Sequence, residues 1–296
     1  MAIFTGAGVA IVTPFYEDGK VNYNKLTELL EEQIAGKTDS IIICGTTGES
    51  STLTEEEHSK VICHAVKVVA GRIPVVAGTG SNSTKTAIQL SKDAEADGAD
   101  GLLVVTPYYN KATQKGLVEH YRAIANEVSL PIIVYNVPSR TGLNVKPQTM
   151  VEMARSIKNV VGIKEASSDI VQIGTLAALA DGDVDIYSGN DDQIVPVLSV
   201  GGIGVISVTS NIIPEDTHNM VAQYLAGNVL ESMRLQLKVM PLALALFSEV
   251  NPIPVKVAMN LMGKNVGPVR SPLSAMEPEN IERLKKTMIE YGLSLA

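Results

Sequence analysis

Short runs of continuous apolar residues recur along the chain, and most are followed by a stretch with helical periodicity. Continuous rather than alternating apolarity is typical of parallel strands that are buried on both faces. The expected strands are Gly8–Thr13, Ser40–Cys44, Pro74–Ala77, Gly101–Val105, Pro131–Tyr135, Val160–Lys164, Asp185–Ser188 and Gly204–Val208. The expected helices between them are Tyr23–Ala35, Thr54–Ala70, Thr84–Asp97, Thr113–Val128, Pro147–Ile157 and Asp169–Ala180.

This alternation of strands and helices predicts an α/β fold, a (β/α)8 TIM barrel over residues 1–224. Residues 225–296 continue with helical patterns at Val229–Leu246, Pro254–Met262 and Pro278–Tyr291, and we expect them to pack on the barrel. A doubly wound sheet is the alternative. Its dinucleotide-binding form needs a GxGxxG turn after the first strand, whereas Gly6 precedes the expected strand and Gly8 begins it.

The composition of the chain argues against some classes of partner and favours one location. The chain has a net charge of -8 and no cluster of Lys and Arg, which argues against nucleic acid. Cys44 and Cys63 are its only cysteines, as expected for a reducing compartment, and the N-terminus has no export pattern, so a cytoplasmic protein is predicted. The uncharged stretch 193–214 is long enough to span a membrane, but its glycines and prolines favour a short helix, a turn and a buried strand.

No metal or cofactor is expected from the sequence. The histidines are scattered and form no zinc-binding pattern, and the cysteines lack metal-ligand spacing. The four histidines are His58, His64, His120 and His218.

In a (β/α)8 barrel the carboxyl ends of the strands meet at one mouth, so polar residues at those ends become neighbours. Lys164 closes one strand there, and partial burial would favour the neutral amine that attacks carbonyl groups. Tyr135 ends the preceding strand and suits proton transfer, with the Thr47 hydroxyl as a possible relay. Lys256 has apolar neighbours too, but falls on a helix after the barrel. The residues therefore predict imine chemistry on a carbonyl substrate, centred on Lys164.

Two further features could bind carboxylates. The glycine-rich turn at 45–48 could present backbone amides, although such a turn is often only a turn. Arg140 follows the fifth strand, and its planar guanidinium suits a carboxylate, although a lone arginine in a loop more often makes a salt bridge.

Six further segments are distinctive: GTTGES (45–50), VTPYYN (105–110), YNVPSRTG (135–142), GIKEAS (162–167), GVISVTSN (204–211) and NPIPVK (251–256). In order and spacing, from near residue 8 to residue 262, the chain closely resembles the dihydrodipicolinate synthase family. GTTGE alone is shared with other pyruvate-dependent aldolases and lyases, whereas YNVPSRTG together with TPYYN is typical of a much narrower group of proteins.

The resemblance implies that Lys164 forms a Schiff base with pyruvate, which then adds to L-aspartate 4-semialdehyde on the route to lysine and diaminopimelate. Members are usually homotetramers, built as dimers of dimers. The implied proton relay is Tyr135, Thr47 and Tyr109, with Tyr109 reaching in from a neighbouring subunit. The residues implied to bind substrate are Thr46, Thr47, Arg140, Gly189 and Ile206.

The resemblance also implies an effector site for lysine, which is weakened in this chain. Ser50, His58, Asn82 and Tyr108 keep the pattern of the lysine-inhibited members. Thr86, however, stands where those members have a glutamate that binds the amino group, and Glu55 stands in place of a histidine. We therefore expect weak or absent inhibition by lysine.

Two other functions remain open at this stage. One is another pyruvate-dependent aldolase, such as an N-acetylneuraminate lyase or a 2-keto-3-deoxy sugar acid aldolase, against which Arg140 within PSRTG argues. The other is a catalytically silent barrel with a binding role, which the intact set of site residues makes a poor explanation.

Overall fold

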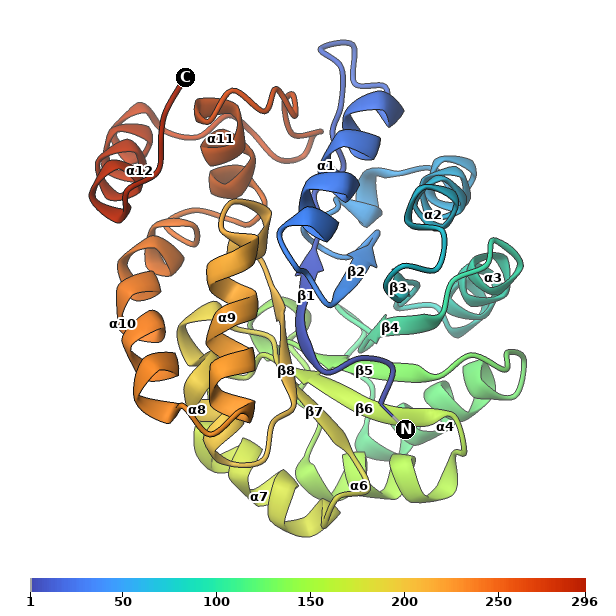
Figure 1. The fold of residues 1–296 in the computed structure, drawn as a ribbon. Helices are drawn as coiled ribbons and strands as arrows, with labels where there is room; N and C mark the ends of the chain where they lie inside the picture. The colour runs from blue at the N-terminus through green and yellow to red at the C-terminus, as the bar shows by residue number, and fades with distance from the viewer. Residues whose placement is uncertain (1) are drawn as a thin grey trace.

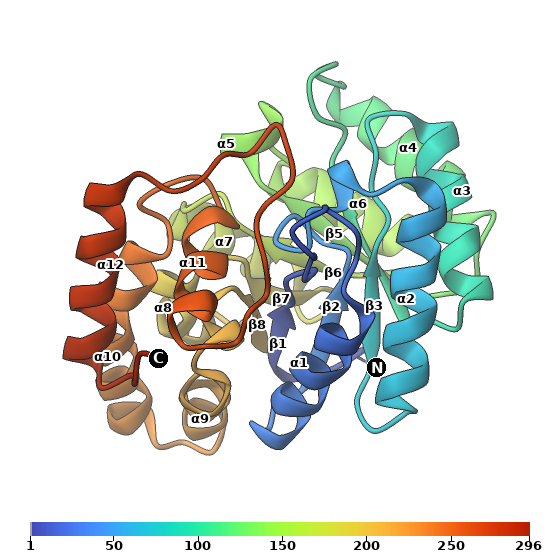
Figure 2. The ribbon, with the colours of Figure 1, turned by 90° about the horizontal axis from the view of Figure 1, so that it is seen from above.

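The computed structural model describes residues 2–296, and its centre is a closed barrel of eight parallel strands (Figures 1 and 2). Each strand pairs with the next, and β8 pairs with β1 through Gly6 and Gly204. The strands are β1 (Gly6–Ala10), β2 (Ser40–Ile43), β3 (Val75–Gly78), β4 (Gly101–Val105), β5 (Ile132–Asn136), β6 (Val160–Glu165), β7 (Asp185–Ser188) and β8 (Gly204–Ser207). The predicted TIM barrel is confirmed, and a doubly wound sheet is excluded.

Helices surround the barrel, and the C-terminal helices pack on one side of it (Figure 1). Those around the barrel are α1 (Tyr23–Ala35), α2 (Glu55–Val69), α3 (Thr84–Ala96), α4 (Gln114–Ala125), α5 (Pro138–Thr141), α6 (Pro147–Ser156), α7 (Ile170–Ala180), α8 (Ile194–Ser199) and α9 (Pro214–Leu225). The last three are α10 (Val229–Ala245), α11 (Ile253–Leu261) and α12 (Pro278–Tyr291). The boundary proposed at residue 224 falls at the end of α9.

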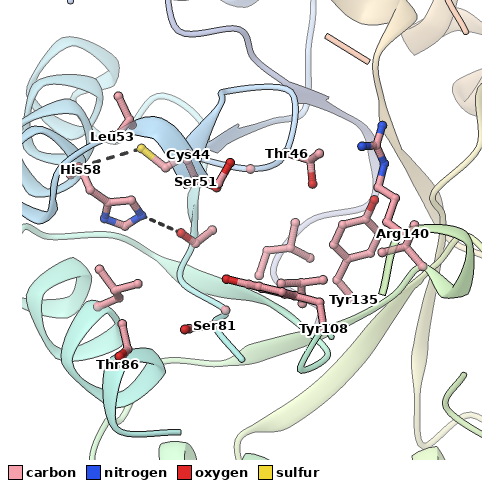
Figure 3. A pocket seen from close by; sticks show the side chains of 18 of the residues that line it. Cys44, Thr46, Ser51, Leu53, His58, Ser81, Thr86, Tyr108, Tyr135 and Arg140 are labelled. Atoms are coloured by element: carbon pink, nitrogen blue, oxygen red, sulfur yellow. Dashed lines mark hydrogen bonds between the residues drawn. The ribbon is translucent and has the colours of Figure 1, made fainter. Parts of the chain in front are cut away.

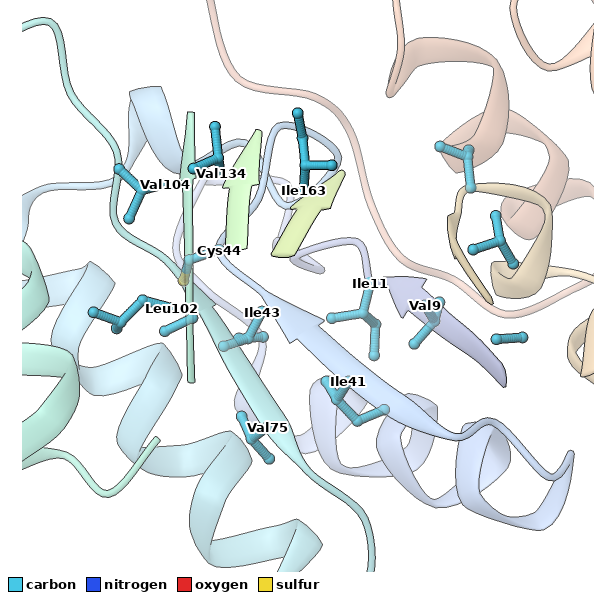
Figure 4. Packing of buried hydrophobic residues seen from close by; sticks show 14 of the residues in the cluster. Val9, Ile11, Ile41, Ile43, Cys44, Val75, Leu102, Val104, Val134 and Ile163 are labelled. Atoms are coloured by element: carbon cyan, nitrogen blue, oxygen red, sulfur yellow. The ribbon is translucent and has the colours of Figure 1, made fainter. Parts of the chain in front are cut away.

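The strands are buried on both faces because their side chains alternate between two apolar layers. Ile41 and Ile43 of β2 point outwards to the helices, in the cluster of Figure 4, whereas Ile42 belongs to the cluster inside the barrel. In β6, Ile163 belongs to the outer cluster. Its neighbour Lys164 therefore faces the barrel interior.

Local sequence signals account for most of the element boundaries. Thr54 caps α2 through a reciprocal pair, in which Glu57 N–H donates to Thr54 Oγ1 at 3.1 Å and Thr54 N–H donates to the Glu57 carboxylate at 3.0 Å. The stretch 193–214 forms α8, β8 and a short 3₁₀ turn, as expected. Within residues 2–296, no helix is long and apolar enough to cross a membrane.

The first strand was predicted too late in the chain. Gly6 and Ala7 already belong to β1, and Gly6 N–H donates to Ile203 O at 3.1 Å. Beyond Ala10, Ile11 N–H still donates to Ile42 O at 3.2 Å, but Val12 N–H donates to a side chain, Asn211 Oδ1, at 3.2 Å. Ile11 and Val12 are buried by packing at the end of the strand, so their apolarity gave a false boundary.

Candidate active site

Lys164 lies at the carboxyl-terminal mouth of the barrel, beside Tyr135. The two residues are register partners on the adjacent strands β6 and β5. The Lys164 Nζ atom lies 4.4 Å from the centre of the Tyr135 ring. The structure therefore brings together the amine and the phenol that were expected to share a site.

The Lys164 side chain is buried, and within residues 2–296 its ammonium donates no hydrogen bond. Burial lowers the pKa of Lys164 from 10.5 to about 8. The negative charge of Asp191 opposes this shift and the positive charge of Arg140 adds to it. About a tenth of this lysine is therefore the neutral amine at pH 7, far more than for an ordinary lysine, and the neutral amine is the form that attacks a carbonyl.

Lys256, the rival lysine, is bound on all sides. Its ammonium donates to the Glu49 carboxylate at 2.8 Å, to Pro268 O at 2.6 Å and to Thr13 O at 3.1 Å. It also lies 4.3 Å from the centre of the Phe15 ring. Its three donors are used, so Lys256 joins the α11 region to the barrel and is not free to attack a substrate.

Thr46 and Arg140 both influence the Tyr135 phenol. Burial raises the pKa of Tyr135, while the charge of Arg140 and a side-chain hydrogen bond with Thr46 oppose that rise. Thr47 instead accepts a hydrogen bond from Asn251 Nδ2 at 2.9 Å. The relay role expected of Thr47 therefore stays a prediction, although both threonines line the cavity of Lys164.

The turn after β2 is rigidly built. Cys44 and Glu49 have left-handed backbone conformations, with φ of 53° at both residues, and Glu49 N–H donates to Thr46 O at 3.1 Å. The Thr13 hydroxyl donates to Gly48 O at 2.6 Å. These contacts fix Thr46 and Thr47 at the mouth before any substrate arrives.

A cavity of about 180 Å³ is lined by Lys164 and most of the other expected site residues. Those that line it are Thr46, Thr47, Tyr135, Arg140, Lys164 and Gly189. Ile206 is fully buried in the apolar cluster inside the barrel and is not among the lining residues. Tyr109 is 89% exposed, on the loop after β4, and does not reach the cavity within its own chain.

A second cavity of about 400 Å³ adjoins the first, and both are lined by Thr46, Tyr135 and Arg140. Figure 3 shows Tyr135 and Arg140 at one end of it and His58 and Thr86 at the other. The effector positions that line it are Ser50, His58 and Tyr108, which keep the pattern, and Glu55 and Thr86, which depart from it. Asn82 is not among the lining residues; its carbonyl accepts a hydrogen bond from Asn110 at 2.9 Å.

Sequence reasoning missed two polar residues of the mouth, Asn251 and Asp191. Asn251 lines the cavity of Lys164 although it lies in the loop between α10 and α11. Asp191 is buried, and its carboxylate accepts hydrogen bonds from Val208 N–H at 2.9 Å and Thr209 N–H at 3.0 Å. Asn251 was within a segment that carried the family resemblance, but nothing in the sequence gave its role.

In the part of the chain described, residues 2–296, no three His, Cys, Asp or Glu side chains gather to hold a metal ion. The fold and the cavity define a class, the (β/α)8-barrel proteins with a buried lysine at the carboxyl-terminal mouth. Within this class the chain belongs to the Dihydrodipicolinate synthetase family, whose model matches residues 3–290.

Known relatives match this chain over almost its whole length. The 4-hydroxy-tetrahydrodipicolinate synthase of Lachnoclostridium phytofermentans is 59% identical over 99% of this chain and 100% of its own. The crystal structure of dihydrodipicolinate synthase from Thermotoga maritima is 45% identical, with a TM-score of 0.96, and covers 99% of this chain and 100% of its own. That of the chloride-inhibited enzyme from Acinetobacter baumannii complexed with pyruvate is 43% identical, with a TM-score of 0.95, covering 98% and 99%.

Proposed function

We propose that this chain is a 4-hydroxy-tetrahydrodipicolinate synthase, which condenses pyruvate with L-aspartate 4-semialdehyde in lysine and diaminopimelate biosynthesis. The observation that carries the proposal is the free, buried amine of Lys164 in a small cavity, with its pKa lowered to about 8. The relatives named above support the choice of reaction.

The amine attacks the C2 carbonyl of pyruvate, and the adduct loses water to form an imine. The protonated imine withdraws electrons, so a proton leaves the pyruvate methyl group and an enamine forms. The enamine carbon attacks the aldehyde carbon of the second substrate. The amino nitrogen of that substrate then attacks the imine carbon, which closes the ring and releases Lys164.

Tyr135 is placed to move protons in these steps, because its phenol lies beside both Lys164 and Thr46. Thr46 therefore replaces Thr47 as the relay hydroxyl in our proposal. Thr47 is assigned to the carboxylate of pyruvate. Arg140 lies at the junction of the two cavities, where its guanidinium suits the carboxylate of the aldehyde substrate.

Tyr109 completes the relay only from a second copy of the chain. It has a left-handed backbone with φ of 73°, and Asn110 N–H donates to Tyr108 O at 2.9 Å across it, so a tight turn holds the exposed side chain outwards. Such strain in a large residue is typical of functional positions. We propose that Tyr109 enters the neighbour's site next to Thr46 and Tyr135.

The assembly that we propose is a homotetramer, a dimer of dimers. An apolar stripe on α10 supports a second contact between copies, because Leu230, Leu237 and Leu244 recur every seven residues and are 77%, 62% and 58% exposed. The Leu237→Asp variant should then sediment as a dimer. A cytoplasmic location agrees with the two free cysteines.

A rate assay with pyruvate and L-aspartate 4-semialdehyde, run beside one with N-acetylneuraminate, tests the proposed function. Turnover of the first pair supports it. Turnover of N-acetylneuraminate alone would assign the chain to another aldolase, and turnover of neither would favour the silent barrel.

A further inference from the structure

Asn251 links the C-terminal helical region to the cavity of Lys164. It lies between α10 and α11, is 5% exposed and lines the cavity. Two expected carboxylate-binding residues contact it. Its side-chain Nδ2 donates to Thr47 Oγ1 at 2.9 Å, and its backbone carbonyl oxygen accepts a hydrogen bond from Arg140 Nη2 at 3.3 Å.

The hydrogen bond from Asn251 determines which role the Thr47 hydroxyl can play. A hydroxyl carries one proton and two lone pairs, and Asn251 already occupies a lone pair. The proton of Thr47 is then directed elsewhere, and within residues 2–296 it donates to no other group. A hydroxyl held in this way at a cavity wall is a preoriented donor, which an anion such as a carboxylate requires.

The rest of Asn251 is incompletely satisfied. Its Oδ1 atom is buried and has no partner among the residues that the structure describes. An unpartnered buried acceptor costs roughly 1–3 kcal/mol, so its retention in a cavity wall needs an explanation other than stability.

We propose that Asn251 is a positioning residue for the reaction. Its side-chain amide fixes Thr47 as a hydrogen-bond donor to the pyruvate carboxylate, and its backbone carbonyl anchors Arg140. This inference rests on the proposed function. A purely structural Asn251 would join the α10–α11 loop to the barrel and would not select between substrates.

Asn251→Leu tests the side-chain contact, because it removes the donor, keeps a similar volume and leaves the carbonyl that binds Arg140. The Michaelis constant for pyruvate should rise about fivefold to tenfold, the size of one neutral hydrogen bond. The constant for L-aspartate 4-semialdehyde and kcat at saturating pyruvate should change less than about twofold. Asn251→Asp should weaken the binding of pyruvate further, because the new carboxylate accepts a hydrogen bond from the Thr47 hydroxyl and so competes with the pyruvate carboxylate.

A double-mutant cycle with Thr47 separates positioning from general damage. Thr47→Val should raise the pyruvate constant by roughly tenfold to a hundredfold, and Asn251→Leu should then add almost nothing. Thr47→Ser keeps the hydroxyl and should retain the dependence on Asn251. Asn260→Leu is the matched control, since Asn260 is exposed and bonds only backbone groups of the same C-terminal region.

Equal effects of Asn251→Leu in the wild-type and Thr47→Val backgrounds would overturn the inference, as would an unchanged pyruvate constant or an equal change in Asn260→Leu. Thermal unfolding identifies variants that do not fold, and Asn251→Asp then provides the second side-chain test. Wild-type protein that traps no pyruvate with borohydride would instead remove the proposed function. Wild-type turnover combined with additive Asn251 and Thr47 effects would overturn the positioning role alone.

Discussion

Replacing Lys164 by methionine should stabilise the protein while abolishing its activity. The lysine is buried without a hydrogen bond inside residues 2–296, and methionine has a similar length and no charge. A pKa lowered from 10.5 to about 8 measures the cost of holding the charged form in the fold. At about 1.4 kcal/mol per pKa unit, that cost is roughly 3 kcal/mol at pH 7.

The sign of the pH dependence follows from proton binding. Between about pH 8 and 10.5 the unfolded chain keeps its proton on Lys164 while the folded chain has lost it. The wild-type protein therefore gains stability as the pH rises through this window. The advantage of Lys164→Met should be largest at pH 7 and should shrink towards pH 10.5.

Urea unfolding at matched protein concentration, at several pH values from 7 to about 10.5, measures this difference. Lys158→Met is the control, because Lys158 is exposed and belongs to none of the ion pairs within residues 2–296. A Lys164→Met protein that is no more stable than wild type at pH 7 would refute the reasoning. So would an advantage that does not change with pH.

Three other variants extend the account. Lys256→Met should destabilise the protein by about 3–5 kcal/mol in the same unfolding assay, because it leaves Glu49 charged and buried; no loss would refute the structural role of this pair. Tyr109→Phe should lower kcat by roughly a hundredfold. Coexpression with Lys164→Met should restore activity in mixed dimers, and no restoration would contradict a shared site. Lysine should not half-inhibit below about 1 mM at saturating pyruvate, whereas Thr86→Glu should increase sensitivity; an already sensitive wild type would contradict this.

The barrel was predictable because its strands are buried on both faces. Such strands give continuous apolar runs such as Ile41–Ile43, whereas strands with one face in solvent alternate apolar and polar residues. The boundary of β1 was not, since Ile11 and Val12 lie beyond the end of the strand but are still packed in the core. Helix α9 was missed because only a short apolar stripe, including Met220 and Val221, is buried on it.

The site was predictable as far as single residues at strand ends allow. Lys164 and Tyr135 each end an expected strand, and consecutive strands are neighbours in a barrel, so both were expected at one mouth. The register of β5 and β6 then places them side by side. The directions of the Thr46 and Thr47 hydroxyls were not predictable, because each depends on a turn with left-handed residues at both ends. Asn251 was hidden because a contact 204 residues away in sequence has no local signal.

The central claim is that Lys164 forms an imine with pyruvate. Incubation with pyruvate and borohydride, followed by peptide mapping with mass spectrometry, tests it directly. We predict a reduced pyruvate adduct on the peptide that contains Lys164, and none when pyruvate is omitted. An adduct on Lys256, or no adduct at all, would contradict the account.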